Sequence, residues 1–218
     1  MERLTVALPK GRMQKDVLAL FGEAGYPAGS PNSRKLILND TLGIFRFLLA
    51  KPFDVPTYVE HGAAALGVAG EDVLRENERD IYEPLGLDMA KCRLVLAGPP
   101  EARDLNLRTE ANLRVASKYP RQARAYFQER GLSAEIISLS GSVELAPAVG
   151  LADLIVDLVQ TGRTLRENGL VELETIRESQ AMLVVNRASH KLYFQTIQEI
   201  IQNLADAVAR RQEQKVAP

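Results

Sequence analysis

One stretch of the chain, LIVDLVQTGRTLRENGL at positions 154–170, restricts the fold more than any other. An apolar run leads to Asp157, the segment TGRT follows at 161–164, and a helix-like segment then runs to Asn168-Gly169. This order predicts a buried strand that ends in an acid and turns through a short loop into a helix. Such a turn places backbone N–H groups and two hydroxyls at the positive end of a helix dipole, where proteins bind phosphate.

An acid beside a phosphate loop indicates a particular kind of ligand. The Asp157 carboxylate can accept hydrogen bonds from sugar hydroxyls, so the loop and the acid together favour a phosphoribosyl group. The same spacing also fits an ordinary helix N-terminus, in which Thr161 caps the helix and Gly162 only eases the turn. The apolar strand and the acid before the loop favour phosphate binding over that alternative.

The segments around this stretch alternate between strand-like and helix-like patterns. From Leu113 to Leu170 the order strand, helix is repeated three times, which is typical of a parallel sheet with right-handed crossovers. The earlier part of the chain has a more mixed α/β pattern. We therefore predict two α/β lobes, with residues 1–92 and 180–218 in lobe I and residues 93–179 in lobe II. Ligands of such sheets bind beyond the carboxyl ends of strands, which here predicts a central cleft between the lobes.

Apolar periodicity and breaker residues set the bounds of the predicted elements. Strands are predicted at 4–8, 35–38, 43–49, 66–68, 93–97, 113–117, 135–139, 153–159, 170–176 and 181–185. Helices are predicted at 13–24, 56–61, 71–77, 120–130, in a short segment that contains Glu144, after the TGRT loop, and as one long helix at 190–211. The polar tail at 212–218 is expected to be frayed.

The composition excludes several classes of protein. The net charge of −1 gives no basic field that would attract nucleic acid. A single cysteine, Cys92, excludes an intrachain disulfide and a cysteine metal cage, and neither His61 nor His190 has metal-ligand spacing, so we predict no metal site built from protein groups. No segment approaches the length of a membrane span or has the form of a signal peptide. We expect a soluble, cytoplasmic protein with no membrane partner.

Three other segments place polar or charged residues where strands end. The triplet Lys-Gly-Arg at 10–12 opens a helix and suits a polyphosphate, although solvated cations in a turn are the simpler interpretation. The loop Ser-Gly-Ser at 140–142 precedes Glu144, and it either faces the same cleft or caps a helix. Asp72 follows a Gly-containing strand end at a helix start, where it can act as a capping acid.

These motifs converge on one family. The segments that carry the resemblance are ALPKGRM, DVPTYVEHG, RLVLAG, RVASKYP, the run IISLSGSVELAPAVGLADLIVDLVQTGRTLRENGL, and SQAMLVVNR. In this order, from Leu4 to Arg187, they closely resemble the catalytic chain of ATP phosphoribosyltransferase, which opens histidine biosynthesis. The resemblance implies two α/β lobes like those of a type II periplasmic binding protein. It implies that the chain condenses ATP with phosphoribosyl pyrophosphate to give N1-(5-phosphoribosyl)-ATP and pyrophosphate.

The resemblance is to the short form of this family, which lacks a C-terminal regulatory domain. It implies a regulatory subunit similar to histidyl-tRNA synthetase in a hetero-octamer, a homodimer of catalytic chains, and Mg²⁺ bound mainly through substrate phosphates. It places the ribose 5-phosphate on the loop at 157–164. Lys51 stands where many relatives have an arginine, and it keeps the charge but not the bidentate fork. The catalytic candidates are Lys10, Arg12 and Arg34, and the substrate-binding candidates are Gly11, Lys51, Asp72, Ser140, Gly141, Ser142, Glu144, Asp157, Thr161, Gly162, Arg163 and Thr164.

Two other functions stay open at this point. A base-salvage phosphoribosyltransferase shares the TGRT loop, but such enzymes usually have two adjacent acids before it, whereas Asp157 stands alone with Asp153 four residues earlier. A non-enzymatic solute-binding protein would have the same fold, but such proteins are usually exported, and no export signal is visible. Fold alone does not decide between these functions.

Overall fold

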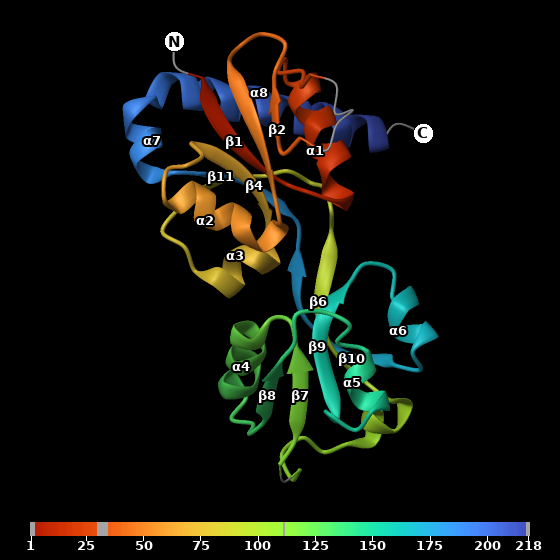
Figure 1. Ribbon diagram of the computed structural model, residues 1–218. Coiled ribbons are helices and arrows are strands. Elements are labelled where there is room, and N and C mark those ends of the chain that lie inside the picture. The colour runs from red at the N-terminus through yellow and green to blue at the C-terminus, as the bar shows by residue number, and fades with distance from the viewer. Residues whose placement is uncertain (1–2, 30–34, 111, 217–218) are drawn as a thin grey trace. The chain divides into compact units, whose positions relative to one another are not determined.

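The chain divides into two compact units in the computed structural model, which describes residues 3–29, 35–110 and 112–216 (Figure 1). Unit 1 comprises Met1–Ala90 and Gln180–Pro218, and unit 2 comprises Lys91–Ser179. Unit 2 is therefore an insertion into unit 1. The predicted lobes differ from these units only at the first crossing, which lies after residue 90 rather than after residue 92.

Unit 1 is built on a six-stranded sheet with the strand order β2-β3-β1-β4-β11-β5. Its strands are β1 (Leu4–Pro9), β2 (Ile37–Asn39), β3 (Phe45–Ala50), β4 (Leu66–Gly70), β5 (Tyr82–Gly86) and β11 (Ala181–Val185). Strands β3, β1 and β4 are parallel, so their carboxyl ends share one edge, whereas β2 and β11 are antiparallel to their neighbours. Every residue of β1 and β4 is buried, as expected for parallel strands covered on both faces.

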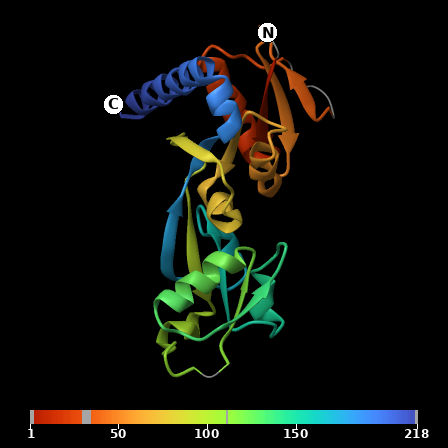
Figure 2. The same ribbon diagram turned by 90° about the vertical axis from the view of Figure 1, so that its left-hand side faces the viewer.

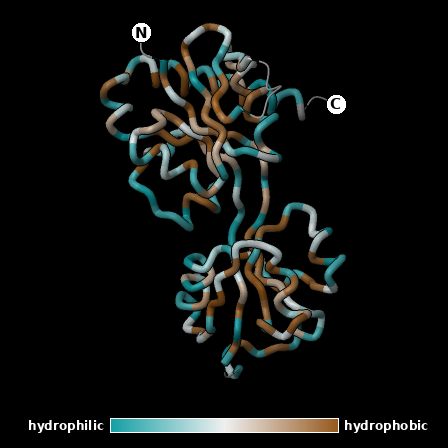
Figure 3. The backbone as a smooth tube through the Cα atoms, in the orientation of Figure 1, coloured by the Kyte–Doolittle hydropathy of each residue, from teal (hydrophilic) through white to brown (hydrophobic). Residues whose placement is uncertain are grey.

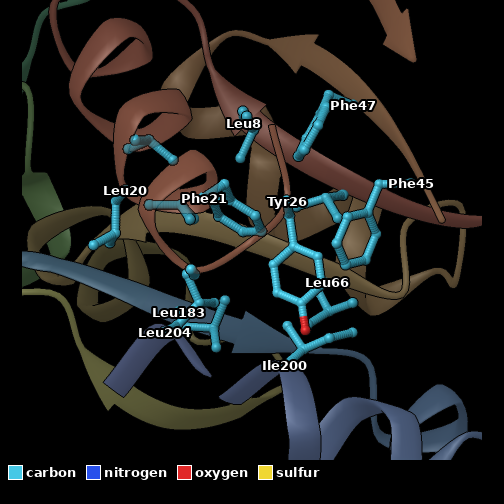
Figure 4. Packing of buried hydrophobic residues seen from close by; sticks show 14 of the residues in the cluster. Leu8, Leu20, Phe21, Tyr26, Phe45, Phe47, Leu66, Leu183, Ile200 and Leu204 are labelled. Carbon is cyan, nitrogen blue, oxygen red and sulfur yellow. The ribbon is translucent and has the colours of Figure 1, made fainter. Parts of the chain in front are cut away.

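Helices cover both faces of this sheet. The helices are α1 (Arg12–Glu23), α2 (Val55–Glu60), α3 (Glu71–Asn77), α7 (Arg187–Leu192) and α8 (Phe194–Val216). Helices α1 and α8 lie side by side in both views of the ribbon (Figures 1 and 2). Between them and the sheet, the ring of Phe21 meets those of Phe45 and Phe47 edge to face, at centroid distances of 6.2 and 5.5 Å, and Ile200 and Leu204 of α8 close the same cluster (Figure 4). A second cluster under α2 and α3 contains Ala7 of β1 and Val184 of β11.

The C-terminal region differs from its prediction in two ways. The single helix predicted at 190–211 is wrong, because the chain forms α7 and α8 with a break at Tyr193. Asn186 fixes the start of α7, since its Oδ1 accepts a hydrogen bond from the Ser189 N–H at 2.8 Å. The tail predicted to be frayed is helical as far as Val216, because its residues are mostly good helix formers.

Asn186 also joins α7 to α2, which predicts a measurable loss of stability. Its Nδ2 donates to the carbonyls of Val59 and Glu60 at 2.8 and 3.1 Å, and only 7% of the residue is exposed. Asn186→Ala removes the cap and leaves these carbonyls without this donor, so we expect the free energy of unfolding to fall by about 2 kcal/mol. Urea unfolding measures the change. The exposed Gln202→Ala is the control, and equal effects of the two substitutions would contradict the prediction.

Unit 2 has a five-stranded sheet with the order β10-β6-β9-β7-β8. Its elements are β6 (Cys92–Gly98), β7 (Arg114–Ser117), α4 (Pro120–Glu129), β8 (Glu135–Ser138), α5 (Leu145–Ala148), β9 (Leu154–Val159), α6 (Arg163–Glu167) and β10 (Val171–Ser179), with short 3-10 segments at Pro52–Asp54 in unit 1 and Pro100–Asp104 here. Strands β7, β8 and β9 are parallel, which confirms the prediction from the alternating pattern. Strand β6 is antiparallel to β9, and β10 is antiparallel to β6.

Hydrophobic segments follow the strands of each unit, and the connecting loops are largely hydrophilic (Figure 3). Among the residues that the structure describes, none of the helices combines the length and the hydropathy needed to cross a lipid bilayer.

Candidate active site

The carboxyl edge of the unit 1 sheet gathers cations from two loops. Pro9 of β1 pairs with Ala50 of β3 in parallel register, and the N–H of Lys10 donates to the Ala50 carbonyl at 2.7 Å. The backbones of Lys10 and Lys51, which follow these strands, are therefore neighbours. Both residues are exposed, and so is Arg12 at the first position of α1. The structure thus brings together the cations that the sequence predicted from two separate segments.

The start of α1 favours an anion. Its N-cap residue is Gly11, whose φ of 112° and ψ of −139° are readily reached only without a Cβ. Helix α1 has no side-chain cap and no acidic residue in its first turn. The positive end of the helix dipole is therefore not offset by a carboxylate of its own first turn, and the side chains of Lys10 and Arg12 add to the same potential.

Asp72 and Arg34 are the two remaining candidates in unit 1. Asp72 lies in the first turn of α3, directly after β4, and so belongs to the same edge of the sheet. It is only 7% exposed, and its carboxylate folds back over Gly70, where a Cβ would collide with Asp72 Oδ1. Arg34 lies outside the described residues.

The carboxyl edge of the unit 2 sheet brings together three loops. Ser117 of β7 pairs with Ser138 of β8 and with Val156 of β9 in parallel register. The buried Ser117 Oγ donates to the Val156 carbonyl at 2.7 Å and accepts from the Tyr119 N–H at 2.8 Å, which links β7 to β9 at this edge. The chain following β7, the loop at 140–144 and the TGRT loop therefore meet at one end of the sheet.

Asp157 lies inside β9 and not at its end, because the strand continues to Val159. The pKa of its carboxyl is raised from 3.8 to about 6, chiefly by burial and also by the nearby Glu144 carboxylate. The Leu158 N–H, which donates to Asp157 Oδ1 at 2.8 Å, and the Lys118 ammonium both lower the pKa. A carboxyl with a raised pKa, next to a second acid and a cation, is typical of a functional site.

A second acid lies near Asp157 and comes from another loop, although the sequence shows Asp157 alone before the TGRT segment. Asp153 precedes Asp157 by four residues, but its carboxylate pairs with Arg114, with Oδ1 at 3.0 Å from Nη2 and Oδ2 at 2.8 Å from the backbone N–H. Glu144 instead acts electrostatically on Asp157. A pair of acids is therefore present beside the TGRT loop, although the two are not adjacent in sequence.

The raised pKa of Asp157 predicts a pH-dependent gain in stability when its charge is removed. Because its pKa rises from 3.8 to about 6 on folding, the folded protein binds more protons in this range and loses stability as the pH increases from about 4 to 6. Asp157→Asn retains an Oδ1 acceptor for Leu158 and removes the buried charge. We expect the free energy of unfolding to rise by about 2–3 kcal/mol at pH 8 and to change little at pH 4. Urea unfolding at both pH values measures this, and equal changes at both would contradict the assigned cause.

The TGRT loop does not use Thr161 as a helix cap. Helix α6 begins at Arg163, its N-cap residue is Gly162 with a φ of 72°, and it has no side-chain cap. The residues on either side of this glycine, Thr161, Arg163 and Thr164, are exposed, whereas Leu165 is buried and anchors the segment. Arg163 Nε pairs with Glu167 at 2.7 Å on the exposed face of α6. The two threonine hydroxyls of the loop are therefore open to a ligand, whereas Gly162 itself is buried.

The loop at 140–144 is likewise open. Ser140, Gly141 and Ser142 are exposed, and Val143 is buried and anchors the loop. Glu144 was predicted inside a helix, but α5 begins only at Leu145, with Glu144 as its N-cap residue and no side-chain cap. Ser142 has a φ of 50°, which is unusual for a residue with a Cβ and is typical of functional loops.

Lys118 is a site residue that reasoning from the sequence missed. It directly follows β7, and its charge acts on Asp157. The sequence does contain an indication of this role, because Lys118 directly follows a predicted parallel strand, just as Lys10 directly follows β1.

Fold and site together define a class of protein. Two α/β units, one inserted in the other and each with ligand-binding residue types at the carboxyl ends of parallel strands, are the architecture of proteins like the type II periplasmic binding proteins. The periplasmic aliphatic sulphonate binding protein SsuA from Escherichia coli matches with a TM-score of 0.60 at 13% identity, over 99% of this chain and 75% of that chain. This similarity concerns the fold alone.

Closer relatives define the family. The family model for ATP phosphoribosyltransferase (HisG) matches residues 51–206. The ATP phosphoribosyltransferases of Caldanaerobacter subterraneus subsp. tengcongensis and Halalkalibacterium halodurans are each 51% identical over 210 residues, which cover 95% of this chain and 99% and 98% of theirs. A solved ATP phosphoribosyl transferase (HisG:HisZ) complex from Thermotoga maritima contains a chain with a TM-score of 0.82 at 34% identity, over 95% of this chain and 99% of that one. The chain belongs to the ATP phosphoribosyltransferase family.

Proposed function

We propose that the chain joins C1 of phosphoribosyl pyrophosphate to N1 of the adenine of ATP. The observation that carries this proposal is the exposed TGRT loop beside the acid pair formed by Asp157 and Glu144 at the edge of unit 2. A phosphate loop next to two acceptors for ribose hydroxyls fits a phosphoribosyl donor. Membership of a family of ATP phosphoribosyltransferases supplies the acceptor.

In the proposed reaction, unit 2 holds the phosphoribosyl group. Thr161, Thr164 and the loop N–H groups bind the 5-phosphate, and Asp157 and Glu144 accept hydrogen bonds from ribose hydroxyls. The bond between C1 and the pyrophosphate oxygen breaks as the N1 lone pair of adenine bonds to C1 with inversion. The leaving pyrophosphate takes the bonding electrons, and the adenine then loses one proton.

Unit 1 carries the cations that stabilise the negative charge of the leaving group. Lys10 and Arg12 lie at the uncapped start of α1, and Lys51 lies beside them. Arg34 is assigned to the same task by family resemblance. Gly11 lets the backbone approach the phosphates closely. This catalysis rests on positioning and electrostatics and does not need a histidine.

Magnesium is expected to take part through the substrate. Among the described residues, no three His, Cys, Asp or Glu side chains gather in a way that could hold a metal ion. Mg²⁺ keeps several waters and binds through phosphates with at most one or two carboxylates, so it does not require such a group of residues. Asp157 and Glu144 are the acids that would contribute. When bound, the ion neutralises charge on the pyrophosphate.

We further propose that the chain works with a regulatory subunit in the cytoplasm. The T. maritima relative was solved as a HisG:HisZ complex, and the match covers almost all of that chain. By family resemblance, the subunit resembles histidyl-tRNA synthetase and senses histidine in a hetero-octamer that also contains paired catalytic chains. We expect histidine to inhibit the chain only when this subunit is present. Inhibition of the isolated chain by histidine, competitive with neither substrate, would contradict this proposal.

Pyrophosphate release distinguishes the proposed function from that of a base-salvage phosphoribosyltransferase. With Mg²⁺ and phosphoribosyl pyrophosphate, the chain with its regulatory subunit should release pyrophosphate when ATP is added and not when free adenine is added. The opposite result would identify a base-salvage phosphoribosyltransferase. Binding of either substrate without turnover would favour a solute-binding protein.

A further inference from the structure

In the TGRTLREN segment, residues 166–168 donate hydrogen bonds to carbonyl groups of residues 161–164. Arg166 Nη1 donates to the Thr161 carbonyl at 3.2 Å, and the Arg166 N–H donates to the Gly162 carbonyl at 3.2 Å. The Thr164 carbonyl accepts from both the side chain and the backbone N–H of Asn168, at 2.9 and 3.2 Å. The carbonyls of Thr161, Gly162 and Thr164 are thus bonded to residues 166–168. Their hydrogen bonds favour one orientation of the loop peptides.

The guanidinium of Arg166 also explains why residue 162 is a glycine. The φ of 72° at Gly162 already disfavours any residue with a Cβ. A Cβ at this position would in addition lie 2.9 Å from Arg166 Nη1 and 3.5 Å from Glu172 Oε1. Glu172 is itself bonded to Arg93 of β6 by both carboxylate oxygens, at 2.8 and 3.0 Å. The missing side chain therefore leaves room for a cation directly against the loop backbone.

We propose that Arg166 is a positioning residue for phosphoribosyl binding, which acts through the TGRT loop and not by contact with the reacting atoms. Its bond to the Thr161 carbonyl orients that peptide, so that the exposed Thr161 hydroxyl stays available to the 5-phosphate. Its charge lies against Gly162 and adds to the attraction for a phosphate dianion. The inference rests on the function proposed above.

Steady-state kinetics of the complex with its regulatory subunit test this role. Arg166→Met keeps the length of the side chain and removes the donors and the charge. We expect the KM for phosphoribosyl pyrophosphate to rise roughly tenfold, the loss expected for one charged hydrogen bond, with the KM for ATP and kcat unchanged. Arg166→Lys should recover part of the affinity because it restores one donor and the charge. The matched control is Arg177→Met, at an exposed arginine of β10 in the same unit, which should change neither KM.

A double-mutant cycle separates positioning from a general structural role. The methyl group of Gly162→Ala displaces the guanidinium, so this substitution should weaken phosphoribosyl pyrophosphate binding less in the Arg166→Met background than in the wild type. Calorimetry with phosphoribosyl pyrophosphate gives the binding constants, and thermal melting checks the fold. Strictly additive effects, or a parallel change in kcat, both KM values and the melting temperature, would overturn the proposal. Absence of phosphoribosyl-ATP from the wild-type reaction would instead refute the proposed function.

Discussion

Removing either Lys10 or Arg12 should lower kcat/KM for phosphoribosyl pyrophosphate by about 10²–10³-fold, the largest single-residue loss that we expect in this chain. A preorganised donor that meets developing negative charge contributes about 2.7–4 kcal/mol to a transition state. Both residues adjoin an uncapped helix start without an acid in its first turn, so their charges are not offset there. The effect should fall mainly on kcat, because the charge on pyrophosphate grows as the bond to C1 breaks.

Methionine is the suitable replacement at both positions, since it retains most of the aliphatic stem. The control is Lys15→Met, which removes the same charge from an exposed position one turn further along α1. Lys10→Met and Arg12→Met should leave the thermal midpoint close to that of the control, because all three residues are exposed. Rates that match the control would show that unit 1 does not hold the leaving group.

The second large effect is expected from the hydroxyls of the TGRT loop. Replacing both Thr161 and Thr164 by valine keeps the side-chain shape and removes two donors to the 5-phosphate. A hydrogen bond to a charged group contributes about 1.5–3 kcal/mol, so we expect the double variant to bind phosphoribosyl pyrophosphate at least ~100-fold more weakly. Binding of ATP should not change, since the acceptor does not need this loop.

The fold of the double variant should be intact, because both threonines are exposed and neither caps α6. Thr175→Val is the matched control, at an exposed threonine of β10 in the same unit. Calorimetric titration with phosphoribosyl pyrophosphate measures the affinity, and circular dichroism checks the fold. Unchanged affinity would rule out the TGRT loop as the phosphate site.

Much of the fold could be predicted from local patterns. The buried strands of both sheets carry continuous apolar runs between Gly, Pro and charged residues. The predicted bounds of β1, β9 and β11 therefore differ from those observed by at most one residue, while β4 extends two residues beyond its prediction. Strand β5 was missed, since its sequence YEPLG contains a proline and a glycine and forms only at the edge of the sheet. The break at Tyr193 was also missed, because Leu192, Tyr193 and Phe194 continue the apolar pattern through it.

The candidate site was predictable one loop at a time, but not as a whole. Each loop showed phosphate-binding residue types after a strand, which local sequence reveals. The proximity of Glu144 and Lys118 to Asp157 depends on the order β9-β7-β8, and this order is set by long-range pairing that no local pattern encodes. Asp153, four residues before Asp157, is not part of this cluster, since its carboxylate is bonded to Arg114.

The bond that forms in the reaction tests the central claim most directly. The complex of the chain with its regulatory subunit is incubated with phosphoribosyl pyrophosphate labelled with ¹³C at C1, ¹⁵N-labelled ATP and Mg²⁺, and the products are followed by nuclear magnetic resonance. We expect a one-bond coupling between the labelled C1 and adenine N1, with the original ribose still on N9 and one pyrophosphate released per product. Release of pyrophosphate with the label found only in ribose 5-phosphate, or no coupling to N1, would contradict the assignment.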